Sequence, residues 1–79
     1  MNKTEILAKV QEIVQDILGL KNLELTLESS AKDVERWDSL SHIGIIMGIE
    51  QEFGFRFSLG ELDSLQNVGD IVDAIIRHT

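Results

Sequence analysis

Residues 38–54, with the sequence DSLSHIGIIMGIEQEFG, predict a central helix that is apolar on two faces. Asp38 or Ser39 is a suitable N-cap for this helix, and Gly54 is a suitable stop. At about 100° per residue its large apolar residues fall into two stripes, one of Leu40, Ile43 and Met47 and one of Ile45, Ile46, Ile49 and Phe53. One stripe can enter a core. The other is then expected at the surface as a contact site, unless the bundle buries this helix on most sides.

The chain before the central helix predicts a first helix followed by a long loop. Residues 3–18 carry a wide apolar stripe at helical period. Asn2 with Glu5 offers a capping box at the start of this helix, and Gly19 offers its stop. Residues 22–28 alternate leucine with polar residues, but no second strand is available to pair with them. We therefore expect an extended loop laid over the core.

The chain after the central helix predicts two further helical segments. Ser58 with Glu61 opens a short helical turn, and Asn67 with Asp70 forms a capping box in front of a last apolar run. Three main helices, a short third helix and a long first loop make a small all-α four-helix bundle. A chain of 79 residues has material for a single core, so residues 1–79 are expected to form one domain.

The composition is that of a small acidic globular protein. Hydrophobic residues make up 43% of the chain, and it has neither proline nor cysteine, which excludes a disulfide scaffold and thiol chemistry. Seven basic residues against 14 acidic ones give a net charge of -7, which disfavours binding to nucleic acid or to an anionic membrane. Charged residues interrupt the first 20 positions, so neither a secretory signal nor membrane insertion is expected. We expect a cytoplasmic monomer with basic protein partners.

Few residues can carry chemistry. His42 and His78 have no carboxylate or second histidine at ligand spacing, so no metal site is predicted. The remaining feature is Asp38-Ser39-Leu40, which places a hydroxyl in the first turn of the central helix. The helix dipole would favour a phosphodiester on Ser39 by about 0.3–1 kcal/mol. Simple capping is the commoner role of such a triplet, and Asp63-Ser64-Leu65 is a second copy of it.

Several further motifs accompany the first triplet. They are Trp37-Asp38-Ser39-Leu40, Ile46-Met47, Ile49-Glu50-Gln51-Glu52-Phe53, Phe57 and Val68-Gly69-Asp70. With these motifs, nearly the whole chain resembles an acyl carrier protein. The resemblance implies that Ser39, flanked by Asp38 and Leu40, carries 4'-phosphopantetheine transferred from coenzyme A by a phosphopantetheinyl transferase. It also implies a non-catalytic carrier of acyl thioesters for ketosynthase-type and other acyl-transferring enzymes of fatty acid, lipid or polyketide-type biosynthesis. Ser64 is assigned no cofactor.

The resemblance also implies a partner surface and an acyl pocket. Basic patches on partner enzymes would meet the carboxylates of Asp38, Glu50, Glu52, Glu61 and Asp63, with Leu40 and Met47 as apolar anchors. An acyl chain would be sheltered by Ile46, Ile49, Phe57, Leu62 and Leu65. The alternative for each apolar residue is an ordinary packing role.

The chain departs from the usual family pattern in places. Ser41, His42 and Gly44 stand where many members carry acids, and Arg36 stands where many carry glycine. Gly44 and Gly48 each cost the helix about 1 kcal/mol against alanine, which indicates close approach of a backbone, an acyl chain or a partner.

Three other functions compete with the acyl carrier. A peptidyl or aminoacyl carrier would use the same serine for a polar load. An unmodified acidic adaptor would bind basic partners through the central helix. A hydrolase acting through Ser39 would lack a base and an orienting acid.

Overall fold

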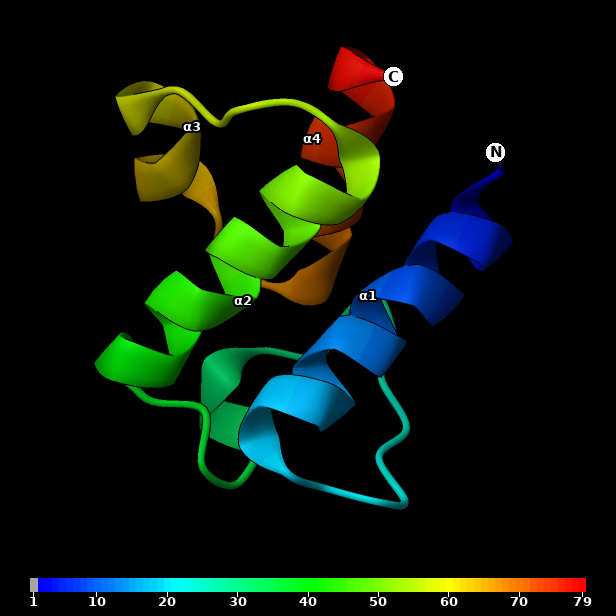
Figure 1. The fold of residues 1–79 in the computed structure, drawn as a ribbon, viewed down its shortest axis with the longest axis vertical. Helices are drawn as coiled ribbons and strands as arrows, with labels where there is room; N and C mark the ends of the chain where they lie inside the picture. The colour runs from blue at the N-terminus through cyan, green and yellow to red at the C-terminus, as the bar shows by residue number, and fades with distance from the viewer. Residues whose placement is uncertain (1) are drawn as a thin grey trace.

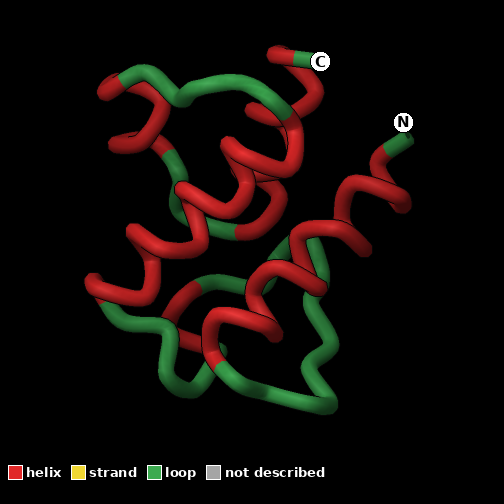
Figure 2. The backbone as a smooth tube through the Cα atoms, viewed as in Figure 1, coloured by secondary structure: helices red, strands yellow, loops and turns green. Residues whose placement is uncertain are grey.

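A computed structural model describes residues 2–79 as an all-α bundle (Figure 1). Its elements are α1 (Lys3–Leu18), the short 3-10 helix η1 (Ala31–Asp33), α2 (Ser39–Phe53), α3 (Leu59–Ser64) and α4 (Val68–His78). Figure 2 shows loop between these helices and no strand from residue 2 to residue 79. The predicted bundle, with its short third helix and long first loop, is therefore confirmed.

The one unpredicted element is η1, which interrupts the first loop. The carboxylate of Asp33 accepts hydrogen bonds from the backbone N–H and the hydroxyl of Ser30, both at 3.1 Å. This contact caps a single turn too short to produce a helical period in the sequence.

Helix α1 has the caps predicted for it. The Glu5 backbone N–H donates to Asn2 Oδ1 at 2.9 Å, and the Asn2 backbone N–H donates to Glu5 Oε1 at 3.2 Å, which completes the capping box. Gly19 ends the helix in the left-handed conformation, with φ 69°.

The start of α4 fastens the long loop to the bundle. Its N-cap is Asn67, whose Oδ1 accepts from the Asp70 backbone N–H at 2.9 Å. The capping box predicted here is wrong in its second half, because the Asp70 carboxylate accepts from the Gln66 backbone N–H instead. The Gly69 N–H donates to the Leu27 carbonyl at 2.8 Å, and a Cβ on Gly69 would lie 2.8 Å from that oxygen. Only glycine lets the loop come this close.

Helices α2 and α4 both pack on α1, and α2 runs beside α1 in the opposite direction (Figure 1). Their buried side chains form one core, in which the most enclosed are Ile6, Val10, Val14, Ile45, Ile49, Val68, Val72 and Ile75. Leu25, Val34 and Trp37 of the first loop complete it, so this extended segment covers the core as expected. No helix within residues 2–79 is long and apolar enough to cross a membrane.

Two glycines bring α2 close to α1. A Cβ on Gly48 would lie 3.0 Å from Ile13 Cγ2, and one on Gly44 would lie 3.6 Å from Ile17 Cγ2. The close approach expected from these glycines is found at Gly48, whereas Gly44 is in ordinary van der Waals contact, and the neighbours at both are side chains of α1. This contact fixes which side of α2 faces the bundle and leaves another side free.

Candidate functional site

The exposed side of α2 carries the predicted second apolar stripe. Leu40, Ile43 and Met47 are 80%, 58% and 56% exposed. The first stripe is buried, with Ile45, Ile46 and Ile49 in the core and Phe53 partly buried against it. The two-stripe interpretation of this helix is therefore confirmed. Three large exposed side chains on one short helix form a patch of the kind that marks a contact surface.

Ser39 is the first residue of α2 and is exposed. Its N-terminal neighbour Asp38 is the N-cap, and Asp38 Oδ1 accepts from the Ser41 backbone N–H at 2.8 Å. This bond, helped by the Ser41 hydroxyl, lowers the pKa of Asp38 and keeps its carboxylate directed at the helix end. No hydrogen bond of the Ser39 hydroxyl is formed within residues 2–79, so this hydroxyl is available for modification.

The second triplet has the opposite setting. Ser64 is the last residue of α3, and its hydroxyl donates to the Glu61 carbonyl at 2.8 Å. A helix C-terminus presents carbonyl oxygens and disfavours an added phosphate. The two Asp-Ser-Leu triplets, alike in sequence, therefore differ in which end of a helix they occupy.

The chain enters α2 through a strained residue. Arg36 has φ 69°, a left-handed conformation that side chains other than glycine rarely adopt. Its Nη1 donates to the Leu18 carbonyl at 3.2 Å and lies over Gly19, where a cation also complements the C-terminal dipole of α1. Arginine thus occupies a backbone conformation that glycine would adopt without strain.

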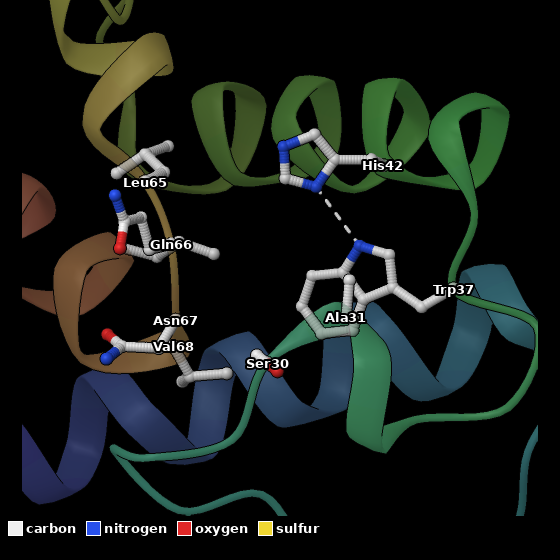
Figure 3. Close-up of a pocket in the computed structure, with 9 residues that line it drawn as sticks. Ser30, Ala31, Trp37, His42, Leu65, Gln66, Asn67 and Val68 are labelled. Atoms are coloured by element: carbon white, nitrogen blue, oxygen red, sulfur yellow. Dashed lines mark hydrogen bonds between the residues drawn. The ribbon is translucent and has the colours of Figure 1, made fainter.

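Trp37 and His42 form a pair beside the start of α2 (Figure 3). Trp37 Nε1 donates to His42 Nδ1 at 3.0 Å, and the two rings stack with centroids 6.1 Å apart. Burial lowers the pKa of His42, which favours the neutral ring that this bond requires. The pair borders a small cavity of about 30 Å³ that reaches Ser30, Leu65 and Ile71.

A larger apolar groove also borders His42. It has a volume of about 210 Å³ and is lined by His42, Ile43, Ile46, Met47 and Leu62. Because it lies between α2 and α3, it can receive a chain attached near the start of α2.

The predicted pocket residues separate into three places. Ile46 and Leu62 line the groove, whereas Leu65 lines the small cavity. Ile49 and Phe57 are buried in the core and line neither space. The sequence interpretation did not include His42 and Ile43, although their spacing of four from Ile46 and Met47 places each pair on one helix face.

Several of the predicted partner carboxylates are already engaged within the bundle. Glu50 accepts from the Phe57 backbone N–H at 2.9 Å, and Glu52 lies 3.7 Å from the Lys9 ammonium. Glu61 accepts from the Ser58 backbone N–H at 2.9 Å, lies 2.9 Å from His78 Nε2, and has its pKa lowered to about 2, chiefly by the Ser58 bond. Asp63 is exposed and forms no ion pair in the described chain.

The fold and the site define a class of protein: a small helical module that presents one available serine at the start of its central helix. Residues 8–75 match the family model described as a phosphopantetheine attachment site. The chain is 36% identical over 78 residues to an acyl carrier protein of Rubrobacter xylanophilus, which covers 99% of this chain and 96% of that protein. It is also 36% identical over 74 residues to one of Clostridium acetobutylicum, covering 94% and 96%.

A solved structure shares the fold. The solution NMR structure of a holo acyl carrier protein from Geobacter metallireducens matches with a TM-score of 0.85 and 38% identity, over 91% of this chain and 83% of that one. The chain belongs to the acyl carrier protein family. It is a carrier rather than an enzyme, it bears a covalent phosphopantetheine arm, and its role involves an acyl cargo and biosynthetic partner enzymes. The predicted family, fold class and cofactor are therefore confirmed.

The start of α2 fits this arm. Ser39 offers an exposed hydroxyl, and the first turn of a 15-residue helix offers backbone N–H donors to a phosphate. Asp38 occupies only the Ser41 N–H, so its carboxylate stays on the helix end without blocking the hydroxyl.

Proposed function

We propose that Ser39 carries the phosphopantetheine arm and that the chain transports acyl groups between enzymes of fatty acid, lipid or polyketide-type biosynthesis. The arm supplies a terminal thiol that holds an acyl group as a thioester. One observation carries the assignment: the Ser39 hydroxyl is exposed and unbonded at a helix N-terminus, whereas Ser64 donates to a carbonyl at a helix C-terminus. Both serines lie inside the matched range 8–75, so geometry is what separates them.

Intact mass spectrometry tests the attachment site. The protein is incubated with coenzyme A and a phosphopantetheinyl transferase of broad specificity, and the mass gain of one arm is followed. We expect Ser39→Ala to abolish the gain and Ser64→Ala to retain it. A gain that persists in Ser39→Ala, or disappears in Ser64→Ala, would contradict the assignment.

We further propose that the groove beside α2 shelters the acyl cargo. Four of its five lining residues are apolar, and Ile46 and Leu62 form two of its walls. An apolar lining suits a hydrocarbon chain better than the polar load of an aminoacyl carrier, because burying polar groups without partners costs free energy. Ile49 and Phe57 support these walls from the core rather than touching the chain.

Calorimetry of loaded forms tests the cargo. At about 0.8 kcal/mol per buried methylene, roughly six sheltered methylenes set an upper bound of about 5 kcal/mol, which ordering of the chain reduces. We expect an octanoyl load to raise the melting temperature above that of the acetyl form. An aminoacyl load that stabilises as much as octanoyl, or an octanoyl load equal to acetyl, would favour the aminoacyl carrier.

The partner surface follows from the same helix. The exposed stripe of Leu40, Ile43 and Met47 offers apolar anchors, and the net charge of -7 favours basic patches on the partners. The phosphopantetheinyl transferase and ketosynthase-type enzymes are the proposed partners. The protein is proposed to act as a cytoplasmic monomer.

A further inference from the structure

His42 is a polar residue at the rim of the apolar groove that the proposed function does not use. It lies one helical turn beyond Ser39 on α2 and borders both the groove and the small cavity. Of the residues that line the groove, His42 is the nearest to Ser39 along the chain.

The bond with Trp37 determines where the proton of His42 sits. An indole N–H can only donate, so His42 Nδ1 must accept at 3.0 Å and cannot carry a proton. The neutral ring then carries its proton on Nε2. Trp37 is only 7% exposed and stacks on the imidazole with an interplanar angle of 26°, so the ring is held in one orientation.

The Nε2–H group has no partner among residues 2–79. No buried side-chain nitrogen or oxygen of the described residues lacks a hydrogen bond, so this unbonded nitrogen must be accessible from outside. Figure 3 shows it on the side of the ring away from Trp37. The other groove residues, Ile43, Ile46, Met47 and Leu62, are all apolar. An oriented donor on the one polar residue that lines an otherwise apolar cleft is the usual pattern of a ligand site.

We propose that His42 Nε2–H donates a hydrogen bond to a carbonyl oxygen of the Ser39 arm or of its load, and in the second case His42 determines which loads this carrier prefers. A purely hydrocarbon load would cover the donor without pairing it, whereas a load with a carbonyl beyond the thioester would satisfy it. The acceptor is either an amide carbonyl of the arm or a carbonyl of the load, such as a 3-oxoacyl group. This inference rests on the proposed attachment at Ser39 but not on sheltering of a hydrocarbon tail.

Nitrogen NMR of the histidine ring tests the donor directly. The His42 ring nitrogens and the Nε2 proton are recorded in the apo, holo, octanoyl and 3-oxooctanoyl forms. We expect a protonated Nε2 and an unprotonated Nδ1 in the apo form. We then expect a downfield shift and slower water exchange of the Nε2 proton when the hydrogen bond forms. These changes appear already in the holo form if the arm supplies the carbonyl, and only in the 3-oxooctanoyl form if the load supplies it. Unchanged signals in all loaded forms, or a proton on Nδ1, would overturn the proposal.

Two matched variants separate the donor from the bulk of the side chain. His42→Gln places amide donors near the position of Nε2, whereas His42→Asn places its amide near Nδ1 and leaves the rim without a donor. If the load supplies the carbonyl, the 3-oxooctanoyl form melts higher than the octanoyl form, and His42→Gln retains this difference while His42→Asn loses it. If the arm supplies the carbonyl, the holo form melts higher than the apo form, and His42→Gln retains this difference while His42→Asn loses it. Both differences surviving in His42→Asn would overturn the proposal.

The same experiments distinguish failure of the proposed function. Persistent mass gain in Ser39→Ala refutes the attachment site before any histidine signal is read. Equal melting of the octanoyl and acetyl forms refutes the sheltering groove, yet a shifted Nε2 proton in the holo or 3-oxooctanoyl form still supports the role of His42.

Discussion

Arg36 combines an unfavourable backbone conformation with a favourable side-chain contact. Its left-handed φ of 69° costs an L-residue about 1–2 kcal/mol, and glycine avoids this cost. The guanidinium offsets part of it by donating to the Leu18 carbonyl at the end of α1. Through this hydrogen bond, Arg36 ties the segment that leads into Ser39 to the C-terminal end of α1.

Two variants of Arg36 separate these contributions. Arg36→Ala keeps the strained backbone and loses the Leu18 bond, so we expect it to lower the free energy of unfolding by about 0.5–1.5 kcal/mol. Arg36→Gly also loses the bond but relieves the strain, and it should be more stable than Arg36→Ala by about 1 kcal/mol. Urea unfolding of the three proteins measures both differences. An alanine variant at least as stable as the glycine variant would show that the left-handed conformation carries no cost.

Helix α3 is held at its ends rather than by a core of its own. It has six residues, none of them buried, and it supplies Leu62 to the groove. Glu61 connects its first turn to α4, through His78 at 2.9 Å and Arg77 at 3.8 Å. Phe55 stacks on the His78 ring with centroids 4.5 Å apart and packs against Phe57. The position of Leu62 in the groove wall therefore depends on the Glu61 carboxylate.

The Glu61 contacts predict an acid-sensitive attachment of α3. The pKa of Glu61 is lowered from 4.5 to about 2 in the folded chain, so folding favours its ionised form. Its contribution is complete above about pH 4.5 and is lost as the pH falls toward about 2. In urea unfolding from pH 7 to pH 3, we expect the stability difference between the wild type and Glu61→Gln to shrink as the pH falls.

Asp63→Asn provides the matched control for this pH series. It removes an exposed carboxylate from the same helix, and that carboxylate has no ion pair within residues 2–79. A difference that shrinks equally for both variants would attribute the effect to overall charge instead of the Glu61 contacts.

Over the molecule as a whole, the net charge and the exposed apolar stripe of α2 act together. The packing of Gly44 and Gly48 against α1 turns the Leu40, Ile43 and Met47 stripe outward. The net charge of -7 then draws basic partners toward a surface with apolar anchors.

This arrangement predicts salt-dependent loading by the transferase. Added salt shortens the Debye length from about 10 Å at 0.1 M to about 3 Å at 1 M, so the rate of loading should fall across this range. Reversing Glu52 of α2 and Asp63 of α3 to lysine should also slow loading, since both side chains are exposed and Glu52 has only an exposed ion pair with Lys9, a kind that contributes little to stability. Glu50 is left intact because it accepts from Phe57.

The matched control reverses two exposed acids of α1, Glu12 and Asp16. It makes the same change in net charge away from the proposed surface. The loading rates are measured by mass spectrometry of samples quenched at successive times. Equal slowing by both double variants would show that total charge matters and that no particular face is recognised.

The amino-acid pattern alone was enough to predict the four α-helices and most of their caps. These features depend on neighbours three or four residues apart, as in the Asn2 and Ser58 capping boxes, so the local pattern contains the whole interaction. The two stripes of α2 were also predictable, because the helical period alone separates them.

Packing between distant segments sets which residues share a cavity and which carboxylates are engaged. Glu61 and His78 are 17 residues apart, and Ile49 faces the core while His42 faces the groove. Such contacts depend on how the helices approach one another, which in turn depends on the glycines between α1 and α2 and on the Gly69 contact that fastens the loop. Periodicity places a side chain on a helix face, but what that face meets is decided by packing between distant segments.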